Sequence, residues 1–161
     1  MEVPQTPRQV FEETLKKVLF WGMILNLGVP TGLLAVAYLL TSAGVTLHLP
    51  SQTLNVIFLV FLIVSLGDLG VASVFRFFML SPERLASQAK IKNVNISALL
   101  LNIAIVIYAL CLISAILGFL YFLFGGQVER GLLLLVFNLL GYQFLRPRPE
   151  LVKKSLGYTS I

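Results

Sequence analysis

The chain of 161 residues is 58% hydrophobic and 12% charged, and its mean hydropathy is +0.93. A soluble globular domain carries about 25% charged residues, so these values exclude an ordinary soluble protein. The composition indicates a protein that lies in a membrane, and one with no solvent-facing domain long enough to fold alone.

Four apolar segments approach the length of a membrane span, which needs roughly 20 predominantly apolar residues. They cover residues 18–40, 54–80, 96–124 and 128–145. Polar turns separate them, and the Gly-rich turn before residue 128 lets the fourth span begin there. The expected fold is all-α: a polytopic membrane protein with a four-transmembrane-helix bundle, formed by residues 1–161 as a single integral membrane domain.

The amino-terminal segment 7–17 predicts an amphipathic helix, because Phe11 and Leu15 share one face opposite Glu12 and Lys16. We expect this stretch to be a cytoplasmic run-in that lies at the membrane interface. A partner-binding face is the alternative interpretation. The carboxyl-terminal tail 146–161 is basic, and we expect anionic lipid headgroups to attract it.

A cleaved signal peptide is a rival interpretation of the first span. The triplet Ala35-Val36-Ala37 has the small-x-small form that signal peptidase accepts. However, the segment before the span is long and carries both acidic and basic residues, and the apolar run itself has the length of a span. These features favour a retained transmembrane helix.

The positions of Lys and Arg predict the orientation of the chain. Of the twelve such residues, all but Arg130 fall on the amino-terminal segment, on the second loop and its flank, or on the tail. Cytoplasmic flanks are enriched in these residues, so both termini are predicted to be cytoplasmic. The net charge of +5 then follows from topology, and no nucleic-acid partner is expected. The small size and the general composition of the chain favour a bacterial inner membrane.

An acid interrupts the second span: Asp68 lies in the stretch SLGDLGVAS, residues 65–73. At 1.5 Å per residue it sits within about 2 Å of the bilayer midplane, where a charge costs on the order of 3 kcal/mol. The same counting brings Asn26 and Asn138 to a similar depth. We expect a polar cluster of Asp68, Asn26, Asn138 and Thr31, in which a protonated carboxyl donates a hydrogen bond to an amide.

Small residues at helical spacing predict where the spans approach one another. They are Ser65 and Ala72 beside Asp68, Gly28 and Gly32 on the first span, and Ser114 and Gly118 on the third. Pro30 lies between the two glycines, where it is expected to kink the helix and free a backbone carbonyl.

The sequence contains few residues that are candidates for catalysis. The sole histidine, His48, has no Cys, Glu or Asp beside it, and the sole cysteine is Cys111, so no metal site or acid–base pair is expected. The sequence also lacks a Gly-rich phosphate loop. We therefore predict a protein that is not an enzyme, with no catalytic residue, no cofactor and no metal.

A resemblance is carried by the second and third spans. The loop between them contains Pro82-Glu83, and the third span contains Ile107-Tyr108-Ala109-Leu110. This hairpin resembles the proteolipid (rotor ring) subunits of rotary ATPases, which carry an acid a few positions before such a stretch. Asn102 stands near that place here. The resemblance thus implies that ion carrying is lost at this position and favours an accessory subunit, unless Asp68 takes over.

Two hypotheses follow from these features. The first is a non-catalytic membrane protein, an accessory or assembly subunit of a larger membrane complex, in which Asp68 holds helices in register. The alternative is a small proton- or cation-coupled transporter or channel that uses Asp68. The expected partners are the lipid bilayer and either a partner membrane protein or further copies of this chain.

Overall fold

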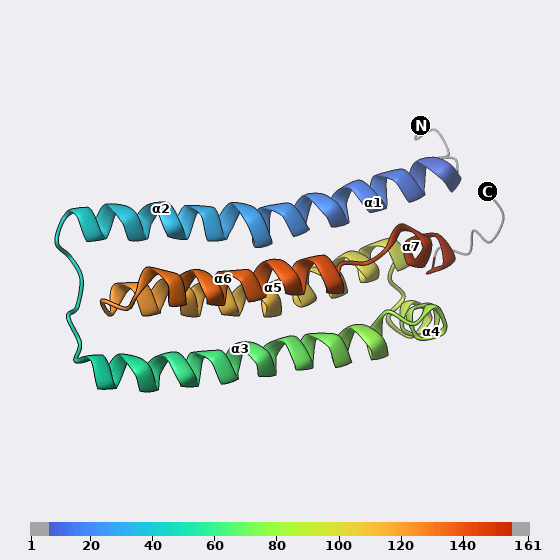
Figure 1. Ribbon diagram of the computed structural model, residues 1–161. Helices are drawn as coiled ribbons and strands as arrows, with labels where there is room; N and C mark the ends of the chain where they lie inside the picture. The colour runs from blue at the N-terminus through green and yellow to red at the C-terminus, as the bar shows by residue number, and fades with distance from the viewer. Residues whose placement is uncertain (1–6, 156–161) are drawn as a thin grey trace.

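The computed structural model describes residues 7–155, and these residues form helices and no strand (Figure 1). The elements are α1 (Pro7–Met23), the π-helical turn η1 (Ile24–Gly28), α2 (Val29–Ser42), α3 (Ser51–Met79), α4 (Pro82–Lys92), α5 (Ile96–Leu123), α6 (Val128–Leu145) and α7 (Pro149–Ser155). Within this part of the chain, four helices are long and apolar enough to cross a membrane. The protein is therefore all-α, with four candidate membrane-spanning helices.

Local capping explains where the helices begin and end. Ser81 Oγ accepts a hydrogen bond from the Arg84 amide at 3.4 Å and caps α4. Asn95 Oδ1 accepts from the Ser97 amide at 3.0 Å and caps α5. Between them, Asn93 adopts a left-handed conformation with φ 50°, which asparagine tolerates at a helix end. For α1, the sequence Thr6-Pro7 predicts a cap at Thr6, but Thr6 lies outside the described residues.

The antiparallel pair α5 and α6 occupies the middle of the bundle, with α1–α2 on one side and α3 on the other (Figure 1). The pair packs closely because Gly118 lacks a side chain: a Cβ there would lie 2.8 Å from the carbonyl oxygen of Gly131. In the most apolar stretch of each helix, 44% of α5 is buried but only 11% of α3. The helix α3 therefore presents most of its surface outward.

The first span is a single rod that runs over Gln9–Ser42 without a break. At 1.5 Å per residue its 34 residues extend about 50 Å, well beyond a hydrocarbon core of about 30 Å. Residues 7–17 are thus the first turns of this rod. Their apolar face, with Phe11 and Leu15, packs against the protein's own core. Protein therefore covers the expected run-in at these two residues, and its position at the membrane interface stays a prediction.

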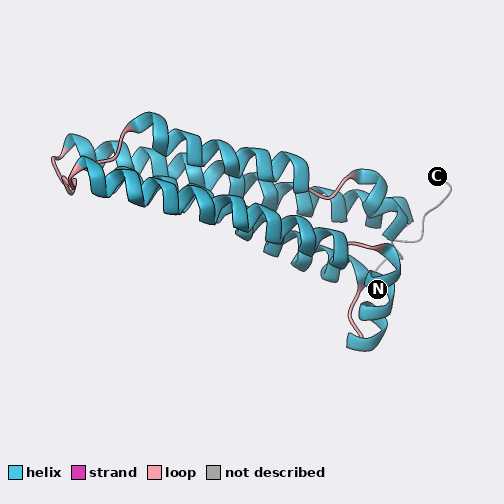
Figure 2. Ribbon diagram, turned by 60° about the horizontal axis from the view of Figure 1, so that its bottom comes forward, coloured by secondary structure: helices cyan, strands magenta, loops and turns pink. Residues whose placement is uncertain are grey.

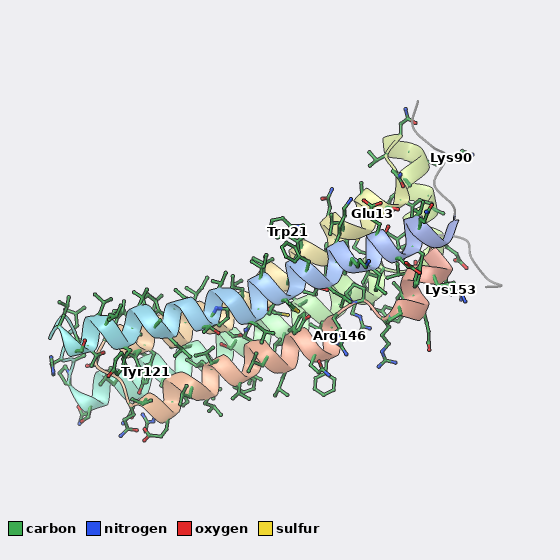
Figure 3. The ribbon with its side chains drawn as sticks, turned by 90° about the horizontal axis from the view of Figure 1, so that it is seen from above. Glu13, Trp21, Lys90, Tyr121, Arg146 and Lys153 are labelled. Atoms are coloured by element: carbon green, nitrogen blue, oxygen red, sulfur yellow. The ribbon has the colours of Figure 1, made fainter. Side chains whose placement is uncertain are left out.

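A small helical cap closes one end of the bundle (Figure 2). It combines the start of α1 with α4 and α7 and will be called the basic end, because Lys90, Lys153 and Arg146 lie toward it, whereas Tyr121 lies at the other end (Figure 3). Fully buried apolar side chains form its core. They are Val18, Leu80, Leu85 and Val152. The described chain consequently begins and ends at the same end of the bundle.

Candidate functional site

A proline creates the most distinctive feature of the first rod. Pro30 has no amide hydrogen, so it cannot donate to the carbonyl of Asn26 four residues earlier. The helix widens here, and the Val29 amide bonds to the carbonyl of Ile24, five residues earlier. The freed Asn26 carbonyl accepts a hydrogen bond from Asn138 Nδ2 at 3.0 Å. Both asparagine side chains are fully buried, so this bond joins α6 to the first rod in the interior.

The side chain of Asn26 folds back along its own helix, where Nδ2 donates to the carbonyl of Gly22 at 3.3 Å. Gly22 admits two aromatic rings: a Cβ there would lie 2.7 Å from Tyr142 and 2.9 Å from Tyr108. The two rings meet edge to face with centroids 5.6 Å apart. The predicted site residues do not include Gly22. Its position one turn before Asn26, on the same helix face, is the signal that identifies it.

The contacts between α5 and α6 show which residues share a depth. A Cβ on Gly141 would touch Cys111, and a Cβ on Gly118 would touch Leu134. Ser114 lies between the two α5 positions, and Asn138 lies between the two α6 positions. Ser114 and Asn138 are therefore at the same level of the bundle.

Asp68 lies on the face of α3 that meets the bundle. Its neighbours Ser65 and Ala72, one turn away on either side, are fully buried. Asp68 itself is partly exposed, although its Oδ2 atom is buried and has no hydrogen-bond partner among the described residues. The adjacent Leu69 packs at the Gly141 position of α6. This contact places Asp68 within about one helical turn of the level of Asn138.

Asp68 does not meet Asn26. The helix α3 and the first rod flank the α5–α6 pair from opposite sides (Figure 1), so the predicted cluster is divided between the two sides. Arg76 does not pair with the acid either, because its guanidinium donates to the carbonyl of Phe144 at 2.9 Å. That bond joins the basic ends of α3 and α6.

Three predicted members of the site face away from the interior. Thr31 is exposed and donates its hydroxyl hydrogen to the carbonyl of Leu27 at 2.6 Å. Gly28 and Gly32 are exposed, and a Cβ on Gly32 would have nothing within 4 Å. Residues two apart on a helix point in opposite directions, so an inward Asn26 forces Gly28 outward. Within residues 7–155, a Cβ on Gly28 or Gly32 would therefore touch no other helix.

Five residues form what we call the polar layer: Asn26, Ser65, Asp68, Ser114 and Asn138. Each has one buried side-chain oxygen without a hydrogen-bond partner in residues 7–155. An unsatisfied buried polar group costs about 1–3 kcal/mol of stability, so these five groups together destabilise the fold. Chemically, these oxygens can accept hydrogen bonds from a water or a partner, or coordinate a cation. No group of three His, Cys, Asp or Glu gathers within the described residues.

The chain matches no protein-family model, no curated protein and no solved structure. The class is therefore the one that the fold defines, an all-α protein with four candidate membrane spans in residues 7–155. The resemblance to rotor ring proteolipids stays a prediction. Asn102, which stands near the position of their acid, is exposed on α5.

Proposed function

We propose that the protein is a small non-catalytic integral membrane protein that serves as an accessory or assembly subunit of a larger membrane complex. One observation carries the proposal: Asp68 is incompletely covered on α3, the least buried of the four candidate spans. A charged carboxyl in the middle of the hydrocarbon costs on the order of 3 kcal/mol. A partner helix packed on α3 would cover the acid and supply a hydrogen-bond donor.

The proposed orientation has the basic end in the cytoplasm of a bacterial cell whose inner membrane holds the bundle. Two observations support this orientation. Lys and Arg are in excess at that end, and Arg130 at the other end is bound by residues of the protein itself. Arg130 donates a hydrogen bond to Asn55 and lies 5.2 Å over the ring of Phe58. These contacts hold its charge against the protein.

The decisive experiment is extraction from the native membrane into lipid nanodiscs, followed by native mass measurement and identification of all co-purifying proteins. We expect defined companions in fixed stoichiometry. Asp68→Asn should fold and keep them, because an amide retains the polar contacts without the charge. Asp68→Leu should reduce their yield, whereas the control Val71→Leu, at an exposed position of the same helix, should not. A homo-oligomer without companions would contradict the proposal.

The alternative function, a proton- or cation-coupled transporter or channel, is favoured by the polar layer. Its unpartnered oxygens lie on four helical elements, and oxygen atoms are ligands for hard cations. In this mechanism Asp68 takes up and releases the ion within a homo-oligomer. Vesicles containing the protein should then show flux that Asp68→Asn abolishes. Wild-type vesicles without flux of protons, sodium or potassium would contradict it.

A further inference from the structure

Two adjoining hollows lie at the basic end of α6 and share Phe144. The first is a polar cleft of about 430 Å³, formed by the end of α6 and the link to α7. The second is an apolar groove of about 370 Å³, formed by α3 and α6. The groove is lined by Leu69, Ser73, Phe137, Leu140 and Phe144. The polar cleft and the apolar groove therefore adjoin at Phe144, and the groove extends from there along α3 and α6 to Leu69 and Phe137.

Three guanidinium groups gather where the two hollows meet. Arg146 and Arg148 line the polar cleft, and Figure 3 shows Arg146 where α6 ends. Arg76 of α3 donates to the carbonyl of Phe144, the residue that the hollows share. Phe144 precedes Arg146 and Arg148 by two and four residues, so this bond holds Arg76 beside the end of α6 that carries them. Glu150 also lines the cleft, but one carboxylate leaves the three cations in excess.

The depth of these groups matches the structure of a lipid leaflet. Arg76 follows Asp68 by eight residues, which is about 12 Å along the helix, and the half-thickness of the hydrocarbon is about 15 Å. With Asp68 at the midplane, the backbone of Arg76 lies about 3 Å inside the hydrocarbon boundary. From there an arginine side chain extends to the phosphates, and the groove beside Leu69 and Ser73 lies at the level of the acyl chains. Arginine binds phosphate oxygens through paired N–H groups, and basic pockets beside membrane helices hold anionic headgroups.

We propose that this composite site binds one anionic glycerophospholipid, with its phosphate on Arg146 and Arg148 and one acyl chain in the groove between α3 and α6. Charge complementarity favours a lipid over a partner helix, because a helix would fill the apolar groove without needing the cations. Arg76 serves as a positioning residue, since its bond to Phe144 holds the two helices together at the mouth of the groove.

The test is native mass measurement of the protein after exposure to equimolar phosphatidylglycerol and phosphatidylcholine with identical acyl chains. We expect retention of one phosphatidylglycerol, with a preference on the order of tenfold over phosphatidylcholine. Arg146→Gln with Arg148→Gln should abolish the preference. The matched control, Lys16→Gln with Lys90→Gln, removes the same charge at exposed positions of the basic end and should keep it. Ser73→Phe, which fills the groove, should lower retention of both lipids.

Three results would overturn the proposal: equal retention of the two lipids by the wild-type protein, loss of the preference in the Lys16 and Lys90 control, or unchanged retention in Ser73→Phe. A photoreactive residue placed at Ser73 identifies the occupant in native membranes. Cross-links to phospholipid support the proposal, and cross-links to a polypeptide contradict it. Because no companion protein is needed for lipid binding, this test can fail or succeed independently of the accessory-subunit experiment.

Discussion

Asn138 donates a hydrogen bond from its side-chain amide to the backbone carbonyl of Asn26, across a distance of 3.0 Å. The acceptor is available because Pro30, four residues further on, supplies no amide hydrogen. The carbonyl that loses its helical hydrogen bond at Pro30 thereby forms a hydrogen bond to another span. A polar side chain of α6 is satisfied at the same place, deep in the apolar interior.

Replacing Asn138 should destabilise the bundle. Asn138→Ala leaves the Asn26 carbonyl without a donor, and we expect a loss of about 1–2 kcal/mol in the free energy of unfolding. The measurement is reversible unfolding in mixed micelles, followed by circular dichroism. Asn102→Ala is the matched control, because Asn102 is exposed. Equal unfolding free energies for the two variants would show that the bond does not stabilise the bundle.

Pro30 and Asn138 should be energetically coupled. Pro30→Ala restores an amide hydrogen that can bond to the Asn26 carbonyl within the helix, so the carbonyl no longer depends on Asn138. In the Pro30→Ala background, Asn138→Ala should therefore cost less, with a coupling of about 0.5–1 kcal/mol. A double-mutant cycle in the same unfolding assay measures this term. Strictly additive effects would mean that the two residues act separately.

The membrane spans could be predicted because hydrocarbon allows only structures that satisfy their own backbone, and apolar runs of span length become helices. The predicted range 128–145 coincides with α6. The amphipathic pattern of residues 7–17 shows that one face is covered but does not show by what. Lipid and the protein core require the same apolar residues, so the packing of this face against the core could not be read from the pattern.

The polar layer was only partly accessible to prediction. Counting residues brings Asn26, Asp68 and Asn138 to one depth, because the rise of a helix is constant. The depth of a residue does not determine the order of the helices around the bundle. In the structure, α5 and α6 separate Asp68 from Asn26. The outward direction of Gly28, by contrast, was available from its spacing of two from Asn26.

Gly118 and Gly32 should respond differently to the same substitution. Gly118→Ala places a Cβ 2.8 Å from the carbonyl oxygen of Gly131, so the α5–α6 pair must separate. We expect destabilisation of about 1–3 kcal/mol. Gly32→Ala meets nothing within 4 Å and should leave the unfolding free energy unchanged or slightly increased. If Gly32→Ala were the more damaging variant, an interface outside this chain would have to cover that face.

The proposed orientation can be tested by chemical labelling, with the native cysteine as an internal reference. Cys111 is fully buried and should stay unlabelled in intact cells treated with a membrane-impermeant maleimide. Ser87→Cys, exposed on α4, should also stay unlabelled until the membrane is permeabilised, because the basic end is proposed to be cytoplasmic. His48→Cys, exposed at the opposite end, should be labelled at once. Immediate labelling of Ser87→Cys alone would invert the orientation and place the basic end outside.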